Sequence, residues 1–113
     1  MKVDGTKITM TRGDSETISI FCKDILGTAV PFVTGDTVYF TIKRDIHEAN
    51  IILQKIITTF IDGKAIVTIL PIDTKALEFI SYIYDVQLTK ADGTVTTIIP
   101  PSKFTIGGEV TYE

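Results

Sequence analysis

The stretch YIYDVQLTKADGTV, Tyr82 to Val95, decides the fold class of this 113-residue chain. Every second side chain from Tyr82 to Leu88 is apolar, which is the period of a strand with one buried face. Asp92-Gly93 follows, and glycine supplies the positive φ of a tight hairpin. The stretch therefore predicts a strand, a tight turn and a second strand.

The same alternation recurs in ETISIFCK (16–23), DTVYFTIKRD (36–45) and KAIVTIL (64–70). Isoleucine, valine and threonine dominate these segments, and their stiff χ1 suits a pleated sheet better than a helix. IDGK (61–64) repeats the Asp-Gly signal and predicts a second hairpin. NIILQKIITTF (50–60) also fits a helix face, because apolar residues recur four apart, but its β-branched content favours a strand.

Two segments depart from this pattern. PIDTKALEF (71–79) is the one stretch that we expect to be helical, with one or two turns and Asp73 as N-cap. Pro100 and Pro101 interrupt the last apolar run, because proline cannot donate to a strand ladder. The register of the final strand stays open at this point.

Short strands about ten residues apart predict an all-β, immunoglobulin-like β-sandwich of about seven to nine antiparallel strands with one short helical turn. A barrel fits less well. We expect residues 1–113 to form a single domain. The helical turn before Tyr82 and Tyr84 resembles the corner at which a tyrosine hydroxyl ties back to the chain. Antibody domains are excluded, since the chain has one cysteine and no tryptophan.

Composition excludes several classes of partner. The net charge is −3 with scattered signs, so we expect no nucleic-acid partner. Apolar runs are too short for a membrane span, and the N-terminus has no signal-peptide core, so we expect synthesis in the cytoplasm and no membrane partner. Assembly into a particle released by lysis is compatible with this.

Reactive chemistry has few candidates. Cys22 is expected on the inward face of its strand as an inert thiol. His47 lies between Asp45 and Glu48, but one histidine is weak evidence for a metal. Asp14 and Glu16 are expected to be solvated surface carboxylates. We therefore predict no enzyme activity, no cofactor and no metal site.

Arg12-Gly13-Asp14 has the letters of a cell-adhesion tripeptide. Adhesion requires an exposed loop tip, whereas this tripeptide lies between two short strand-like runs. Gly13 permits a bend, and Asp14 can accept backbone N–H bonds. We therefore interpret the tripeptide as the turn into a strand.

Outward-facing apolar side chains suggest a docking surface. If Ile20 and Phe40 face the core, Phe21 and Tyr39 face outward, joined by Ile83 and Ile98, and such clusters favour docking. A loop that covers them is the alternative. The same face could stack on sugars, although the absence of tryptophan argues against a carbohydrate-binding module.

The order of features in TRGDSETISI, DGKAIVTILPIDT and YIYDVQLTKADGTVTTI, followed by Phe104 and Ile106, resembles the N-terminal domain of baseplate upper proteins from tailed phages and prophages of Gram-positive bacteria. The resemblance covers nearly the whole chain and rests on framework residues. The PPS segment (100–102) departs from the Gly-type turn expected before the last strand.

The resemblance implies a structural protein of the virion. It implies an N-terminal domain of a longer tail protein that docks on other baseplate or tail proteins, anchors the receptor-binding apparatus and forms homo-oligomers in the particle. The alternatives are the carbohydrate-binding module and an immunoglobulin-like spacer of a bacterial surface protein.

Overall fold

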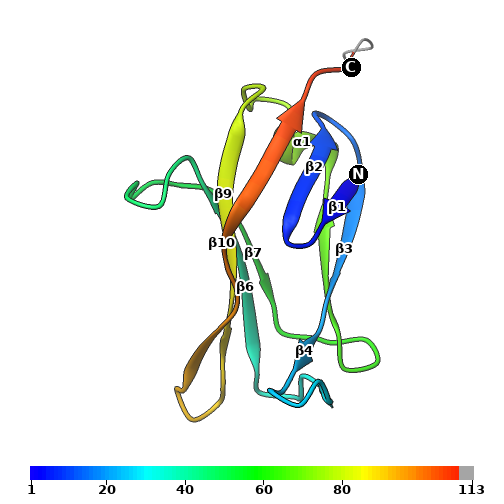
Figure 1. Cartoon of the computed structure of the whole chain (residues 1–113), viewed down its shortest axis with the longest axis vertical. Coiled ribbons are helices and arrows are strands. Elements are labelled where there is room, and N and C mark those ends of the chain that lie inside the picture. Colours follow the sequence, from blue (N-terminus) through cyan, green and yellow to red (C-terminus); the bar gives the residue numbers. More distant parts are fainter. Residues whose placement is uncertain (110–113) are drawn as a thin grey trace.

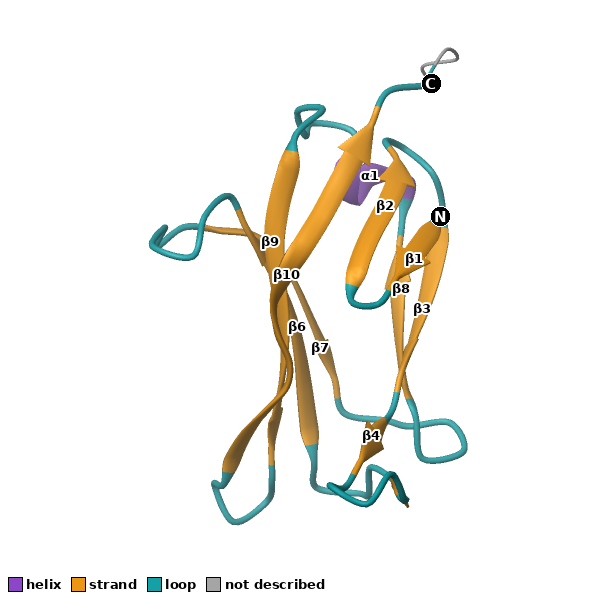
Figure 2. Cartoon of the chain, in the orientation of Figure 1, coloured by secondary structure: helices purple, strands orange, loops and turns teal. Residues whose placement is uncertain are grey.

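The alternating stretches form strands, and most of the side chains that the alternation selects are buried. In the computed structural model, which describes residues 1–109, these residues form ten strands and one short helix (Figures 1 and 2). The elements are β1 (Lys2–Asp4), β2 (Lys7–Thr11), β3 (Glu16–Ile20), β4 (Cys22–Lys23), β5 (Ala29–Val30), β6 (Thr37–Lys43), β7 (Ile51–Ile57), β8 (Ala65–Ile69), α1 (Pro71–Thr74), β9 (Ser81–Thr89) and β10 (Val95–Gly107).

The first layer is a six-stranded sheet in the order β1-β2-β10-β9-β6-β7. Its centre is the antiparallel pair β6–β9, in which Phe40 lies opposite Val86 and Ile42 opposite Tyr84. All four of these side chains are buried on the inner face. The segment 50–60, which also fitted a helix, forms the edge strand β7, so its prediction as a strand is confirmed.

The expectation of purely antiparallel strands is wrong at one place. β2 lies parallel to β10, with Ile8 opposite Phe104 and Met10 opposite Ile106. The first part of the chain therefore pairs with the last part, side by side in Figure 1. A parallel pair needs a long crossover between its strands, and here the chain from β3 to β9 provides it.

The second layer is the pair β3–β8, and a separate hairpin is formed by β4 and β5. The prediction of a hairpin at 61–64 is only half right. Ile61 and Lys64 form an isolated bridge around Asp62-Gly63, but β7 belongs to the first layer and β8 to the second. The tight turn is present, and the chain uses it to change layers.

The core lies between the two layers. Phe40, Tyr84 and Phe104 are packed together, with ring centroids between 5.2 and 6.2 Å apart. The buried apolar side chains are Ile8, Met10, Ile20, Phe32, Val38, Phe40, Ile42, Ala65, Val67, Ile69, Tyr82, Tyr84, Val86, Leu88, Phe104 and Ile106. Residues from both ends of the chain therefore share one core.

The register of the final strand, left open by the sequence, is irregular around the two prolines. β10 runs through Pro100 and Pro101, with shifts of its register against β9 between Thr97 and Ile99 and between Ile99 and Ser102. Its pairing with β2 begins only at Phe104. The prolines are thus accommodated at bulges, before the strand acquires its second neighbour.

The helical turn and the tyrosine corner follow each other in the chain between β8 and β9. Asp73 is not the N-cap: it is the third residue of α1, and its Oδ2 accepts the backbone N–H of Leu70 at 2.8 Å. Farther along, the Tyr82 hydroxyl accepts the backbone N–H of Glu78 at 3.0 Å and donates to its carbonyl at 3.5 Å. The expected tie between a tyrosine hydroxyl and the preceding chain is confirmed.

Candidate docking surfaces

The four residues predicted to form a docking surface do not lie on one surface. Tyr39 and Ile83 are half-buried on the outer face of the six-stranded sheet, on β6 and β9. Phe21 is exposed between β3 and β4, in the other layer. Ile98 lies in the bulged part of β10 and packs against the core. Period-two counting fails for Ile98, because a bulge adds one residue to the strand.

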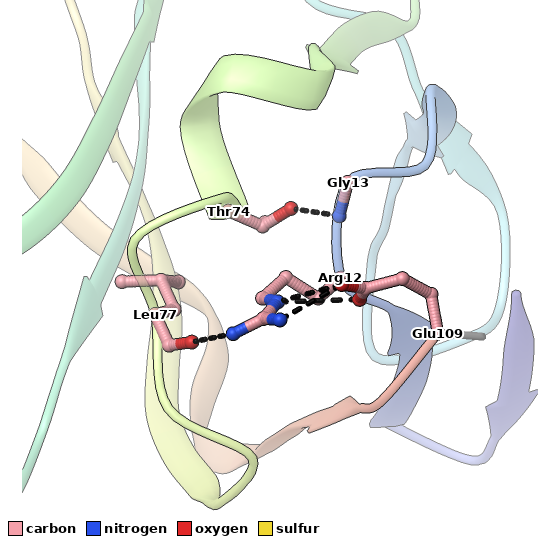
Figure 3. A network of polar contacts seen from close by, with 5 residues as sticks. All are labelled: Arg12, Gly13, Thr74, Leu77 and Glu109. Carbon is pink, nitrogen blue, oxygen red and sulfur yellow. Dashed lines mark hydrogen bonds and ion pairs between the residues drawn. The ribbon is translucent and has the colours of Figure 1, made fainter. Parts of the chain in front are cut away.

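Arg12 and Gly13 of the Arg-Gly-Asp tripeptide contact residues from distant parts of the chain (Figure 3). Gly13 has a φ of +83° and donates its N–H to the Thr74 hydroxyl at 2.8 Å. The N–H of Asp14 bonds to the carbonyl of Thr11, at 3.2 Å. Within residues 1–109 the Asp14 carboxylate itself accepts no hydrogen bond, contrary to the role expected for it.

Arg12 is committed to interactions within the chain. Its Nη2 lies 2.8 Å from Glu109 Oε1, and its Nη1 donates to the carbonyl of Leu77 at 3.4 Å. Its guanidinium lies 4.2 Å from the ring centroid of Phe79. The hydrogen bond from Arg12 holds the pKa of Glu109 below its ordinary value. The tripeptide forms the turn between β2 and β3, so its interpretation as the turn into a strand is confirmed.

The candidates for reactive chemistry lie apart. Cys22 is half-buried, not fully buried, because the chain leaves β3 at Phe21 and Cys22 pairs with Val30 instead. His47 is exposed in the loop between β6 and β7, where its N–H bonds to Asp45. The part of the chain that the structure describes contains no cluster of histidine, cysteine or carboxylate side chains suited to a metal.

The segment Phe21–Val33, which we call the docking arm, forms a small hairpin at the end of the molecule away from α1 (Figure 1). Asp24 organises its tip: Oδ1 accepts the N–H groups of Leu26 and Thr28, each at 2.9 Å. Gly27, with a φ of +83°, closes the turn by donating to the Asp24 carbonyl. The tip is thus fixed by its own hydrogen bonds.

The root of the docking arm is tied to the core. Phe32 is buried, its N–H bonds to the Gly63 carbonyl at 3.0 Å, and its ring lies 5.2 Å from that of Phe60. At Val33, the N–H donates to the carboxylate of buried Asp36 at 3.1 Å. The arm is consequently held at both its tip and its root.

The tip of the arm presents apolar side chains to solvent. Ile25 is 100% exposed and Leu26 is 85% exposed, the two most exposed large apolar residues of the described chain. Strand alternation did not predict these exposed side chains, because it does not determine whether a side chain in a turn faces solvent or the core. The signal was available in DILG (24–27), where two large aliphatic residues occupy the centre of a turn that usually takes polar ones.

A second feature is a depression of about 260 Å³ on the outer face of the six-stranded sheet. Polar side chains from three adjacent strands form much of its lining, and aliphatic side chains complete it. The lining residues that we use are Thr41, Gln54, Ile83, Asp85 and Gln87. Gln54 Nε2 donates to Thr41 Oγ1 at 3.0 Å.

Asp85 is the unusual group of this depression. Desolvation raises its pKa above the ordinary value, although the charge of Lys43 acts in the opposite direction. No hydrogen bond to its carboxylate is found in residues 1–109. A partly desolvated carboxylate beside two glutamine amides can accept hydrogen bonds from a hydroxylated ligand.

Comparisons with protein-family models, with curated proteins and with solved structures found no match to this chain. No helix among residues 1–109 has the length and apolar character needed to cross a membrane.

Proposed function

We propose that this chain is an immunoglobulin-like β-sandwich that docks in a phage or prophage tail baseplate and anchors the receptor-binding apparatus there through protein–protein contacts. The resemblance of its framework segments to the N-terminal domain of baseplate upper proteins supports the biological setting. The protein would then belong to the virion, with other baseplate or tail proteins as partners.

Two features support the immunoglobulin-like class. Facing sheets enclose the core, with β10, β9, β6 and β7 in one layer and β3 and β8 in the other. The hydroxyl of Tyr82 ties back to Glu78 at the start of β9, as in the tyrosine corner of such sandwiches. Both features concern topology and a local hydrogen bond, so they bear on fold class alone.

One observation carries the docking role: the apolar tip of the docking arm. A fully exposed Ile25 beside Leu26 leaves apolar area in water, and burial of that area against another protein is favourable by about 25 cal/mol per Å². Because Asp24 already fixes the turn, little conformational entropy is lost on binding. A preorganised apolar tip of this kind is suited to a pocket on a partner protein.

The test uses particles released by prophage induction from a strain that carries the gene. The double variant Ile25→Ser/Leu26→Ser is compared with the wild type and with Ile72→Ser, which removes an exposed isoleucine (74%) from α1. We expect the wild type and I72S to copurify with tails and to be detected at the tail tip by immunogold microscopy. We expect I25S/L26S to be absent from the particles.

Two outcomes contradict different parts of the proposal. Wild-type particles that lack the protein would remove the baseplate assignment. Particles that incorporate I25S/L26S as fully as the wild type would remove the docking arm as the contact. Expression level and thermal unfolding of each variant are measured alongside, since both substituted side chains are solvent-exposed and should leave the fold intact.

The depression around Asp85 favours a second candidate, a carbohydrate-binding role. Gln87 and Asp85 offer polar groups for sugar hydroxyls, and Ile83 offers an apolar wall. Tyr39 lies opposite Gln87 on the same face of the sheet, where its ring could contribute stacking. Glycan-array binding that is lost in Asp85→Ala/Gln87→Ala and kept in Asp14→Asn would support this role, whereas no glycan binding by the wild type would eliminate it.

A further inference from the structure

The two edges of the six-stranded sheet are protected very differently. A sheet edge exposes unpaired backbone N–H and C=O groups, and proteins usually shield such edges with short strands, charges or covering segments. Here the edges are β1 and β7, and within residues 1–109 each pairs with one neighbour only. Comparison of the two therefore indicates which edge is left for a partner.

The β1 edge carries ordinary protection. β1 is three residues long, Lys2–Asp4, and two of its three side chains are charged. Its central residue, Val3, is 55% exposed. A short charged strand offers a second chain few hydrogen bonds and little apolar area.

The β7 edge lacks this protection. β7 is seven residues long, with the sequence IILQKII, and five of these residues are large aliphatics. Ile51 and Ile56 are 50% and 57% exposed. The single charge, Lys55, does not guard the edge, because its Nζ lies 2.8 Å from Asp73 Oδ2 and the side chain is only 25% exposed. An unshielded apolar edge of this length is a template for strand addition.

The sequence of β7 identifies the added strand. Read backwards, IILQKII becomes IIKQLII, so the strand is two-fold symmetric about Gln54 apart from the exchange of Leu53 and Lys55. We infer that β7 pairs antiparallel with β7 of a second copy of this chain, about a two-fold axis beside Gln54, to join two six-stranded sheets into one. A self-complementary contact of this kind is what a closed two-fold dimer requires.

The pairing makes defined neighbours. Gln54 lies opposite Gln54 of the second copy on the outer face of the joined sheet, and Ile56 approaches the segment 51–52 of the second copy. A bulge between Leu53 and Ile51 directs Ile52 toward the core and leaves the exposed Ile51 on the outer face. Leu53 lies opposite the aliphatic stem of Lys55 of the second copy. Both side chains are on the inner face, because each is one residue from Gln54, which is on the outer face. A groove lined in part by Ile57 and Ile66 adjoins the same end of β7, where it can receive the exposed Ile51 of the second copy.

The first test is sedimentation velocity of the whole chain from about 1 to 500 µM, a range that covers weak and moderate dimers. We expect a concentration-dependent monomer–dimer equilibrium for the wild type. Ile56→Lys places a charge against the apolar Ile51–Ile52 segment of the second copy and removes buried apolar area, so it should raise the dissociation constant at least about tenfold. Val3→Lys changes an equally exposed side chain on the opposite edge and should leave the dissociation constant unchanged.

The second test identifies the contact by disulfide formation in a Cys22→Ser background, which removes the chain's own thiol. Opposite residues of an antiparallel pair have Cα atoms about 4.5 to 5.5 Å apart, so Gln54→Cys should cross-link to its copy under mild oxidation. Thr41→Cys, on the next strand inward, is the control. The two copies of Thr41 are three strand spacings apart, about 14 Å, and should not cross-link.

The inference is independent of the baseplate assignment, because it concerns the purified chain alone. It is overturned if the wild type remains monomeric up to about 500 µM. It is equally overturned if a dimer forms that I56K does not weaken, or if Q54C cross-links no faster than T41C.

Discussion

Tyr82→Phe isolates one hydrogen bond of the fold. The ring of Tyr82 is 1% exposed, and its hydroxyl accepts the Glu78 N–H at 3.0 Å. Phenylalanine preserves the ring and its packing but leaves that N–H without its partner. The loss of such a bond, with part of the desolvation of the donor, costs about 1.5 kcal/mol. We therefore expect the free energy of unfolding of Y82F to fall by about that amount.

The control is the same substitution at a half-buried position whose hydroxyl makes no hydrogen bond in the described residues. Tyr39 lies on the outer sheet face, and its hydroxyl has no hydrogen-bond partner within residues 1–109, so Tyr39→Phe should change stability by less than about 0.5 kcal/mol. Urea unfolding measures the free energy of unfolding of both variants. In thermal unfolding, the melting temperature of Y82F should lie about 6 °C below that of the wild type. If Y82F and Y39F unfold at the same urea concentration with equal slopes, the tie to Glu78 contributes nothing and the reasoning is refuted.

Three further outcomes are expected. Gly63→Ala should lower the free energy of unfolding by about 3 kcal/mol, because the new Cβ would lie 2.5 Å from the Cβ of Pro31. Gly93→Ala has open space around the new Cβ, so it should cost only about 1 kcal/mol, for its positive φ. Urea unfolding compares the two variants. Desolvation raises the folded-state pKa of Tyr84. The contribution of its protonated hydroxyl to stability is therefore full below about pH 10 and is lost as the pH rises through the folded-state pKa. Tyr84→Phe should flatten the decline of thermal stability at alkaline pH. Desolvation opposes the ionisation of Asp73, but hydrogen bonds from Lys55 and from the backbone lower its pKa in the folded state. The contribution of Asp73 to stability is therefore full above about pH 4 and is lost as the pH falls through the folded-state pKa. Asp73→Asn should flatten the decline of thermal stability at acidic pH.

The strands and most of the core could be predicted from the sequence. Alternation selected Phe40, Val67 and Tyr84 as inward-facing, and all three are buried. Such a prediction succeeds because the two faces of a strand are set by the local geometry of the backbone, one residue after another. It failed at Ile98, where a bulge changed the local geometry.

The candidate docking surfaces were harder to predict. The fold separates Phe21 from Tyr39 by placing β3 and β6 in different layers, although both side chains had the same outward pattern in the sequence. The exposed tip at Ile25 went unrecognised because a hydrophobic residue in a turn is as readily interpreted as one that folds back onto the core. Whether it does so depends on what the rest of the chain packs against it.

By itself, the sequence determined which segments are extended, which side chains face inward and where the Asp-Gly turns fall. Only the tertiary structure decided that β2 lies parallel to β10, that Arg12 reaches Glu109 across 97 residues, and that β7 is an edge strand with one neighbour among residues 1–109. The physical reason is the range of the interactions: alternation and turn chemistry act between residues close in sequence, whereas strand neighbours are chosen by hydrogen bonds and packing between distant ones.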